Sequence, residues 1–337
     1  MAQKLKSICN SSLTRKTLLT LVGVFSLSLS SCNTHKMYGD TYFLYDTYVD
    51  VTYYDFDEQS IGDVFDILAK YNDLADNYKE IRSINNIATI NKSNDKIEID
   101  KALYDLLARS FELKEITNGY FNPLIGGLSN LWKNSLKNSQ IPNENLILEE
   151  INKMNSSSIV LSNDEENKYY VQRIGDGLID LGAITKGYVM DLISSYLKGS
   201  NNTSYIVNAG KSSILLGEKF NDTGLFNLTI NDVAKNAYIS CKNTIVTTSG
   251  VSERGKTIDG VTYSHIVNPF TGSAVNNYDM AYIIGNEGAL CDALSTTFMM
   301  LDLETIKKYA EQYDLEILLY KNSKIVYKSD GFEVKYH

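Results

Sequence analysis

Proline is scarce in this chain, whose 337 residues contain only three. The scarcity excludes a proline-rich linker between modules, and the sequence shows no internal repeat or low-complexity tract. Hydrophobic residues make up 43% and charged residues 22% of the chain, a balance typical of globular proteins that bury a sizeable core. We therefore expect one large domain or two closely joined lobes.

Histidine and cysteine are also few. The histidines are His35, His265 and His337, and the body of the chain contains two cysteines, Cys241 and Cys291. No cluster of these residues has the spacing of zinc or iron ligands. Cys241 and Cys291 could form a disulfide in an exported protein, or they could be buried small residues.

The common nucleotide-binding loops are missing. Neither a GxxxxGK[ST] loop nor a GxGxxG fingerprint occurs, which argues against the usual nucleotide-binding folds. The formal net charge of −9 argues against a nucleic-acid partner.

A secretory signal opens the sequence. The first 31 residues contain four basic residues and no acidic residue, and they include an apolar run over 18–29. This run is shorter than the ~20 residues that a membrane-spanning helix needs. Ser30-Ser31-Cys32 resembles the cleavage site of a bacterial lipoprotein, in which Cys32 would be lipidated. The alternative is an ordinary signal peptide followed by an incidental cysteine.

We therefore expect an exported lipoprotein that is attached to the membrane through the lipid on Cys32. It would be anchored to the outer side of the cytoplasmic membrane, or be periplasmic where an outer membrane exists. Residues 1–31 would form the signal peptide, residues 32–40 a tether and residues 41–337 the folded domain.

One stretch in the middle of the chain has the pattern of a strand, a turn and a helix. An apolar strand is predicted over 178–181, a break at Gly182, and an amphipathic helix that ends at Gly199, where a cap glycine is expected. Backbone N–H groups and the positive end of a helix would meet there and attract an anionic ligand. The stretch also carries Asp180 and Lys186. The alternative is an ordinary strand-to-helix turn with a solvated lysine.

Periodicity predicts the other elements. Alternating β-branched and aromatic residues predict strands over 41–54, 160–161, 169–173, 205–210, 214–217, 226–230, 244–248, 280–284, 315–320 and 324–328. Helical spacing predicts helices over 60–75, 100–118, 289–301 and 303–313. Strands interspersed with helices indicate a mixed α/β architecture.

Few residues offer chemistry. His265 lies between a strand and a Pro-Phe-Thr-Gly turn, where a side chain can face a cleft, although a lone histidine can also be structural. Asp292 and Thr296 share one face of a helix, with Ser295 beside them. Carboxylate and hydroxyl oxygens suit Mg²⁺, whereas an aspartate near a helix start can also be a cap.

Several ordered motifs together resemble the ApbE family of FAD:protein FMN transferases. The resemblance runs from about residue 42 to 302. The motifs are Leu44-Tyr45-Asp46-Thr47, Gly119-Tyr120-Phe121-Asn122-Pro123, the segment from Asp180 to Gly187, Asn208-Ala209-Gly210, Thr248-Ser249-Gly250, the segment from Tyr263 to Gly272, and Asp292-Ala293-Leu294-Ser295-Thr296. Tyr45 stands where the family has methionine, Lys211 where it has glycine, and Asn122 and Asn268 where it has aspartate.

The resemblance implies a mixed-sheet fold with flanking helices and a cleft for FAD between the two lobes. It also implies transfer of FMN from FAD to a Ser or Thr hydroxyl of an acceptor protein, with release of AMP. His265 would be the catalytic base. Mg²⁺ would be held by Ala183, Asp292, Ser295 and Thr296. The flavin and FAD contacts would come from Tyr45, Tyr78, Tyr120, Phe121, Asn122, Asp180, Lys186, Ser249, Gly250 and Ile266.

Two other functions are compatible with the same residues. Water in place of the acceptor hydroxyl would give an FAD diphosphatase that releases FMN and AMP. A flavin-binding or solute-binding lipoprotein without chemistry is the second alternative, and Asp292, Thr296 and His265 argue against it. The sequence contains no clear Ser/Thr-Gly-Ala-Thr acceptor motif, so we expect the enzyme and not its target.

Overall fold

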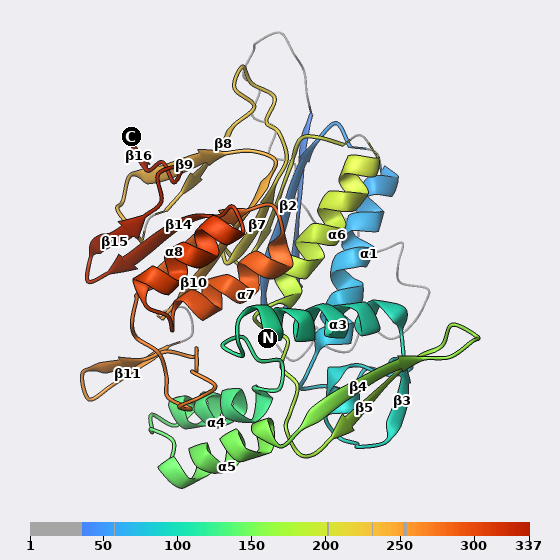
Figure 1. The fold of residues 1–337 in the computed structure, drawn as a ribbon. Helices are drawn as coiled ribbons and strands as arrows, with labels where there is room; N and C mark the ends of the chain where they lie inside the picture. The colour runs from blue at the N-terminus through green and yellow to red at the C-terminus, as the bar shows by residue number, and fades with distance from the viewer. Residues whose placement is uncertain (1–35, 57, 201, 231, 252–254) are drawn as a thin grey trace, which may run out of the picture. The chain divides into compact units, whose positions relative to one another are not determined.

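An eight-stranded antiparallel sheet forms the centre of the fold (Figure 1). The structure is a computed structural model that describes residues 36–337 apart from residues 57, 201, 231 and 252–254. Across the sheet, the strands are β1 (Met37–Leu44), β2 (Thr47–Tyr54), β6 (Tyr205–Ala209), β7 (Ser213–Leu216), β10 (Thr244–Gly250), β13 (Met280–Gly285), β14 (Glu316–Lys321) and β15 (Lys324–Lys328). The predicted signal peptide and Cys32 lie outside the described residues.

Helices cover one face of this sheet. The described helices are α1 (Glu58–Ala75), α2 (Ile87–Ile90), α3 (Lys101–Ile116), α4 (Gly126–Lys137), α5 (Glu144–Asn155), α6 (Thr185–Gly199), α7 (Gly288–Phe298) and α8 (Leu303–Gln312). Figure 1 shows α1 and α6 side by side, and α6 also packs against α7. Their apolar faces bury the main hydrophobic core against strand residues such as Val51, Val207 and Ile283.

A small second sheet covers part of the opposite face. It contains β8 (Phe226–Thr229), β9 (Ala237–Cys241) and β16 (Lys335–Tyr336), in the order β16-β9-β8. Val246 and Tyr282 of the main sheet and the fully buried Phe332 form a separate apolar cluster beneath it. The prediction that residues 226–230 continue the main sheet is therefore wrong, because β8 pairs with β9 at the edge of the separate sheet β16-β9-β8.

The remaining strands form two small sheets beside the helices. One has the order β3-β5-β4, with β3 (Lys96–Ile99), β4 (Ser158–Asn163) and β5 (Tyr169–Ile174). The other is the hairpin of β11 (Lys256–Ile258) and β12 (Val261–Tyr263). The predicted hairpin of 160–161 with 169–173 is confirmed by the β4–β5 pairing, whereas β3, β11 and β12 were not predicted.

The first predicted strand, over 41–54, is wrong as one element. The chain turns back at Tyr45 and Asp46, whose φ angles are 55° and 57°, so that β1 and β2 form a hairpin. Positive φ at both central residues is the geometry of a tight hairpin turn. Because β1 begins at Met37, the end of the predicted tether over 32–40 is part of the sheet.

The predicted strand over 178–181 is also wrong. Only Leu178 makes a bridge, with Ile125, and the next residues bind other groups. Ile179 N–H donates to Asn91 Oδ1 at 2.8 Å, and Asp180 N–H donates to the Pro123 carbonyl at 2.9 Å. These partners satisfy the buried backbone without a neighbouring strand.

The predicted long helices are confirmed within a few residues at each end. Asp100 caps α3 as expected, because its side chain accepts a hydrogen bond from Ala102 N–H. Helix α6 ends at Gly199, but Ser200 is the C-cap and Gly199 is not a cap glycine. No helix of the described residues is long and apolar enough to cross a membrane.

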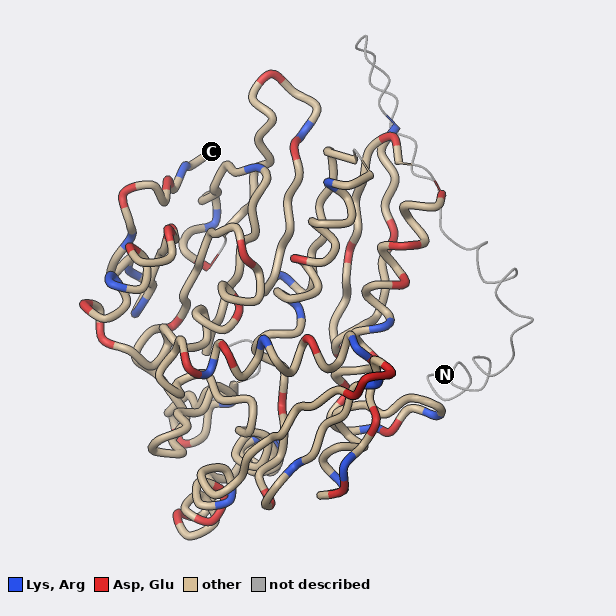
Figure 2. Tube along the Cα trace, turned by 45° about the vertical axis from the view of Figure 1, so that its right-hand side comes forward, with Lys and Arg blue, Asp and Glu red and all other residues tan. Residues whose placement is uncertain are grey.

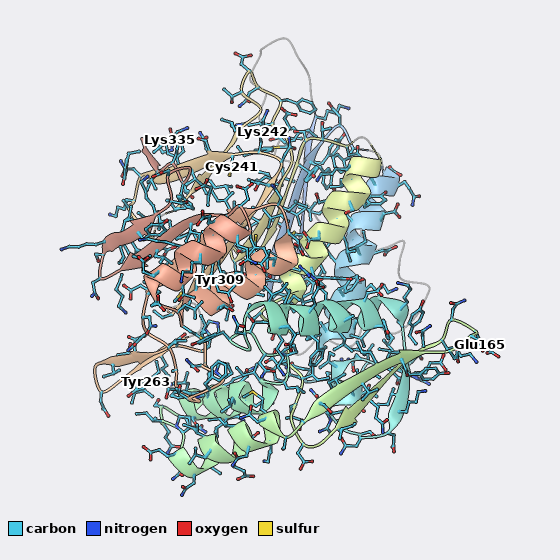
Figure 3. All side chains as sticks on the ribbon, in the orientation of Figure 1. Glu165, Cys241, Lys242, Tyr263, Tyr309 and Lys335 are labelled. Carbon is cyan, nitrogen blue, oxygen red and sulfur yellow. The ribbon has the colours of Figure 1, made fainter. Side chains whose placement is uncertain are left out.

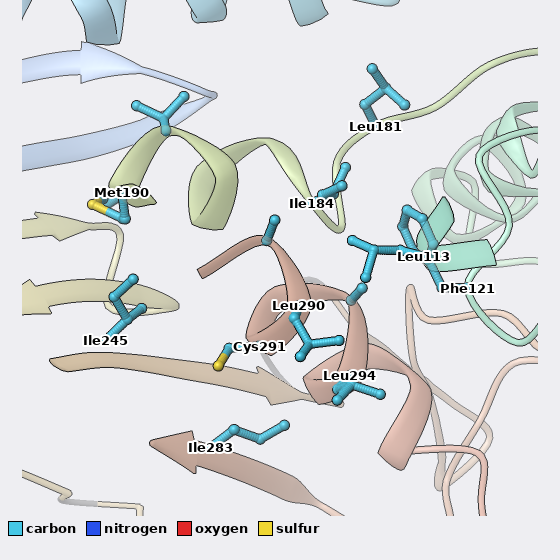
Figure 4. Packing of buried hydrophobic residues seen from close by; sticks show 14 of the residues in the cluster. Leu113, Phe121, Leu181, Ile184, Met190, Ile245, Ile283, Leu290, Cys291 and Leu294 are labelled. Atoms are coloured by element: carbon cyan, nitrogen blue, oxygen red, sulfur yellow. The ribbon is translucent and has the colours of Figure 1, made fainter. Parts of the chain in front are cut away.

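The two cysteines of the described chain are not paired with each other. Cys241 lies on β9, labelled in Figure 3, and Cys291 lies on α7 in the main core, labelled in Figure 4. Both are buried and free, so the alternative of two buried small residues is confirmed. Figure 2 shows acidic and basic residues interspersed along most of the described chain. In the sequence, residues 37–69 contain no Lys or Arg.

Candidate functional site

A cavity of about 1270 Å³ opens where loops and helix ends from distant parts of the chain meet. Its walls include the β1–β2 turn, the β6–β7 turn, the start of α6, one side of α7 and the loop after β12. A cavity of this size is larger than most small-molecule sites and suits an extended dinucleotide. Its lining contains charges of both signs, with five lysines (Lys133, Lys137, Lys186, Lys211 and Lys256) and five aspartates (Asp46, Asp76, Asp180, Asp232 and Asp292). The lysines offer contacts to an anionic ligand, although the lining as a whole has no net positive charge.

Asp292 is the most perturbed acid of the cavity. Its side chain is only 6% exposed, and both carboxylate oxygens accept a hydrogen bond. Gly187 N–H donates to Oδ2 at 2.6 Å and Ser213 Oγ donates to Oδ1 at 2.8 Å. Burial raises the pKa of the carboxyl to about 6, while the Lys186 ammonium and these two donors oppose the rise.

Hydroxyl groups lie beside Asp292 on α7 and on β10. Ser249 Oγ lies 2.8 Å from Ser295 Oγ and 3.3 Å from Thr296 Oγ1. Ser295 Oγ also donates to the Asp292 carbonyl at 2.9 Å, as expected one turn along a helix. Three hydroxyl oxygens from two elements thus lie together, and the Asp292 side chain lines the same cavity from the same helix, α7.

This donor set fits a magnesium ion. Oxygen ligands and few protein contacts are what Mg²⁺ prefers, and each Asp292 oxygen keeps a lone pair after accepting its hydrogen bond. Among the described residues, no group of three or more His, Cys, Asp or Glu side chains could hold a metal ion. Asp292, Ser295 and Thr296 would hold the ion, with Ala183, which lines the same cavity directly before α6.

The start of α6 forms the part of the wall next to α7. Asp180 Oδ1 accepts from Gly182 N–H at 2.8 Å, which tightens the turn that carries Ala183. Ile184 is the N-cap and makes no side-chain cap hydrogen bond. The N–H of Gly187 is used by Asp292, so only part of this helix end is open to an anionic ligand.

Aromatic residues form another wall. Tyr45 N–H donates to Asn72 Oδ1 and its hydroxyl donates to the Leu68 carbonyl, which fixes the ring. Tyr78 is 55% exposed, and Lys133 Nζ lies 3.9 Å from the centre of its ring. Tyr120 packs edge-on against Phe270 at 4.9 Å. Such rings can stack on or enclose a planar heterocycle.

His265 lies in a braced loop. Ile266 N–H donates to the buried Ser264 Oγ at 2.9 Å, and Gly272 N–H donates to the Asn268 carbonyl at 2.7 Å. Trp132 Nε1–H donates to the Gly272 carbonyl and ties the loop to α4. These hydrogen bonds fix the backbone of the loop that carries His265, and His265 lines the cavity.

The structure brings nearly all predicted site residues to this one cavity. Its lining includes Tyr45, Tyr78, Tyr120, Phe121, Asn122, Asp180, Ala183, Lys186, Ser249, His265, Ile266, Asp292, Ser295 and Thr296. Gly250 does not line it and instead pairs with Met280 in the sheet, where a Cβ would overlap the Met280 sulfur. Cys32 lies outside the described residues.

The sequence analysis did not single out three residues that line the cavity or support its lining. Lys133 lines the cavity over Tyr78, whereas Ser213 and Asp191 lie behind the lining, where Ser213 binds Asp292 and Asp191 binds the start of α7. Ser213 lies three residues after the Asn208-Ala209-Gly210 motif, so its closeness to that motif could have indicated it from the sequence. The other two come from helices whose packing the sequence does not reveal.

The geometry agrees with the comparison to known families. The model of the ApbE family matches residues 45–319, so the chain belongs to the ApbE family. A protein of Treponema pallidum (strain Nichols) named FAD:protein FMN transferase is 29% identical over 224 residues, which are 62% of each chain. A protein of the same name from Klebsiella pneumoniae (strain 342) is 25% identical, covering 74% of this chain and 78% of the relative.

Solved structures share the fold. The ApbE protein of Thermotoga maritima superposes with a TM-score of 0.72 at 24% identity, over 89% of this chain and 97% of that one. The flavin transferase ApbE of Vibrio cholerae gives a TM-score of 0.69 at 19% identity, over 89% and 99%. The predicted mixed α/β fold of the ApbE type is thereby confirmed.

Proposed function

We propose that the chain is an FAD:protein FMN transferase that depends on Mg²⁺. The observation that carries the proposal is that the buried Asp292 and the hydroxyls of Ser249, Ser295 and Thr296 line one cavity, which lysines such as Lys186 also line. A pure binding site has no need of a buried carboxylate next to the phosphates of its ligand, because the charge would repel them. A cation between the two removes that repulsion.

In the proposed reaction, FAD lies in the cavity with its flavin against the aromatic wall of Tyr45, Tyr78 and Tyr120. Its pyrophosphate lies between the start of α6 and α7, near Lys186. A bound Mg²⁺ would neutralise charge on the pyrophosphate as the P–O–P bond breaks. Positioning and charge stabilisation supply most of the rate in phosphoryl transfer of this kind.

The acceptor hydroxyl forms the new bond. Its oxygen attacks the phosphorus of the FMN half, its proton passes to His265, and AMP leaves with the bridging oxygen. The product is a phosphodiester that joins FMN to the acceptor protein. Histidine is a common general base in enzymes, and His265 lines the cavity where the acceptor hydroxyl would enter.

The acceptor and the compartment belong to the same proposal. The acceptor would be a flavoprotein with a Ser/Thr-Gly-Ala-Thr-like motif. The chain would act outside the cytoplasmic membrane, attached by a lipidated Cys32, and would make covalent flavoproteins for electron transfer there. The signal-like sequence of the first 31 residues supports this localisation.

Product analysis tests the proposal. The full chain in detergent is incubated with FAD and Mg²⁺, with and without a peptide that carries the acceptor motif. AMP, free FMN and the peptide mass are followed, and each reaction is repeated with a chelator.

A flavin adduct on the peptide, with AMP released and both products lost on chelation, is the expected result. Free FMN and AMP without an adduct would instead identify an FAD diphosphatase. FAD that binds and stays intact would identify a flavin-binding protein, and turnover in the presence of chelator would overturn the metal assignment.

A further inference from the structure

Asp191 binds the first turn of a helix other than its own. Its carboxylate lies on α6, where Oδ1 accepts from Gly288 N–H at 2.6 Å and Oδ2 accepts from Ala289 N–H at 2.9 Å. The N-cap residue of α7 itself, Glu287, makes no side-chain cap hydrogen bond. Asp191 therefore supplies the cap of α7 from a neighbouring element.

The backbones of the two helices touch at a pair of glycines next to this cap. A Cβ on Gly187 would overlap the Gly288 carbonyl, and a Cβ on Gly288 would overlap the Gly187 carbonyl. One helical turn further along α7, Asp292 accepts the Gly187 N–H. Glycine contact and hydrogen bonds in both directions thus join α6 to α7, and Figure 4 shows Met190 of α6 and Leu290 of α7 in the core around this crossing.

This crossing joins the two elements that carry the proposed metal site. Ala183 directly precedes α6, whereas Asp292, Ser295 and Thr296 lie on α7. The distance between these groups depends on how α7 sits along α6. A shift of α7 by a fraction of an ångström would move three candidate ligands together.

We propose that Asp191 is a positioning residue that fixes α7 against α6 and so sets the geometry of the metal site. The inference rests on the proposed metal dependence. Asp191 does not line the cavity, so its effect passes through the α7 backbone and not through contact with FAD or the ion. Partners behind metal ligands commonly change metal affinity by about 10–100-fold when they are removed.

Metal binding in the absence of turnover tests the inference. Mn²⁺ is titrated into the wild-type chain, Asp191→Ala and Asp191→Asn, and free Mn²⁺ is measured by electron paramagnetic resonance. FAD affinity is measured separately by flavin fluorescence. We expect Asp191→Ala to weaken Mn²⁺ binding about 10–100-fold. Asp191→Asn should lie between it and the wild type, because the amide keeps one acceptor oxygen.

Asp302→Ala is the matched control. Asp302 is the N-cap of α8 and accepts from Thr305 N–H at 2.9 Å, so this variant also removes an aspartate cap. It lies outside the cavity and should leave Mn²⁺ affinity unchanged, although it lowers the stability of the protein. Circular dichroism confirms that each variant is folded at the titration temperature.

Equal Mn²⁺ affinity for the wild type and both Asp191 variants would overturn the inference. Equal losses of Mn²⁺ affinity in Asp191→Ala and Asp302→Ala would overturn it as well, because the change in affinity would then follow from lower stability alone. If Asp191→Ala does not fold, Asp191→Asn decides in the same way. Absence of Mn²⁺ binding by the wild type would overturn the proposed metal site and the inference with it, a result distinct from the others.

Discussion

Asp292 differs from an ordinary surface aspartate in three features. It is almost fully buried, it accepts hydrogen bonds at both oxygens, and burial raises the pKa of its carboxyl to about 6. A buried carboxylate without a cation is costly, so the site stores unfavourable electrostatic energy that a divalent cation would relieve. The residue is therefore the natural first target for substitution.

Asp292→Asn should abolish Mg²⁺-dependent release of AMP. The amide keeps the size of the side chain but removes the negative charge that would hold the cation. We therefore expect kcat to fall by at least about 10²-fold. AMP is measured by chromatography over a range of Mg²⁺ concentrations. Full activity in this variant would contradict the assignment of Asp292 as a metal ligand.

His265→Gln should slow transfer to the acceptor by roughly 10²–10⁴-fold and leave FAD affinity nearly unchanged. Glutamine can donate and accept hydrogen bonds but cannot accept the proton of the acceptor hydroxyl near neutral pH. The adduct is followed by peptide mass and FAD binding by fluorescence. His337→Gln, at the end of the chain, is the matched control.

A loss of FAD affinity as large as the loss of rate in His265→Gln would contradict the role of a base. It would show that the residue only binds FAD. An unchanged rate would exclude His265 from the chemistry altogether.

The candidate site could be predicted at the level of its short motifs but not of their partners. Tyr45, Asp180, His265 and Asp292 each stand in a recognisable local pattern, and the cavity contains all of them. Ser213 and Asp191 act through hydrogen bonds across 79 and 97 residues of sequence. Local patterns carry no information on such pairs, since helix packing decides them.

At the scale of elements, the α6–α7 crossing is the closest approach that the site depends on. Gly187 is buried in the first turn of α6, where its N–H and its missing side chain are both used. The same helix contains a second glycine, Gly199, with no atom near its absent Cβ. The two positions provide a direct comparison of close packing with helix propensity.

Gly187→Ala should lower the free energy of unfolding by about 3 kcal/mol or more, because its Cβ would meet backbone atoms that cannot rotate away. Gly199→Ala should leave that free energy unchanged or raise it by up to ~1 kcal/mol. Urea unfolding of both variants measures the difference. Similar values for the two variants would show that the crossing is looser than described.

The elements themselves were predictable where local periodicity decides structure. The helices over 60–75 and 289–301 were found because their apolar residues recur at helical spacing. The hairpin at Tyr45 and Asp46 was missed because alternation continues across the turn and neither residue is glycine. The strand at 178–181 was wrong because Ile179 and Leu181 are buried by helices and loops, which apolar composition alone cannot distinguish from a sheet.

At the scale of the whole molecule, two carboxyls near the crossing link stability to pH. Burial raises the pKa of Asp191 and of Asp292 to about 6. Between about pH 4 and pH 6 the folded protein therefore binds more protons at these groups than the unfolded chain does. Their contribution to the free energy of unfolding falls as pH rises through this range and stays low above it.

We therefore expect the free energy of unfolding of the metal-free wild type to fall by up to about 3 kcal/mol per group between pH 4 and pH 7, compared with a variant that lacks the group. Denaturant unfolding with a chelator at pH 5 and pH 7 compares the wild type with Asp292→Asn. We expect the stability difference between the two proteins to shift in favour of the variant at pH 7. A pH-independent difference would show that the carboxyl titrates as in water. Saturating Mg²⁺ should oppose the trend, because the cation binds the ionised form.

The hydrogen bond between Gly187 and Asp292 joins residues 105 positions apart. Synthesis delivers the chain from its amino end, so α6 emerges long before α7, which completes the cavity. Until residue 296 has been added, the wall that carries Asp292, Ser295 and Thr296 cannot form. A chain that ends earlier would have the start of α6 without the carboxylate that accepts its Gly187 N–H.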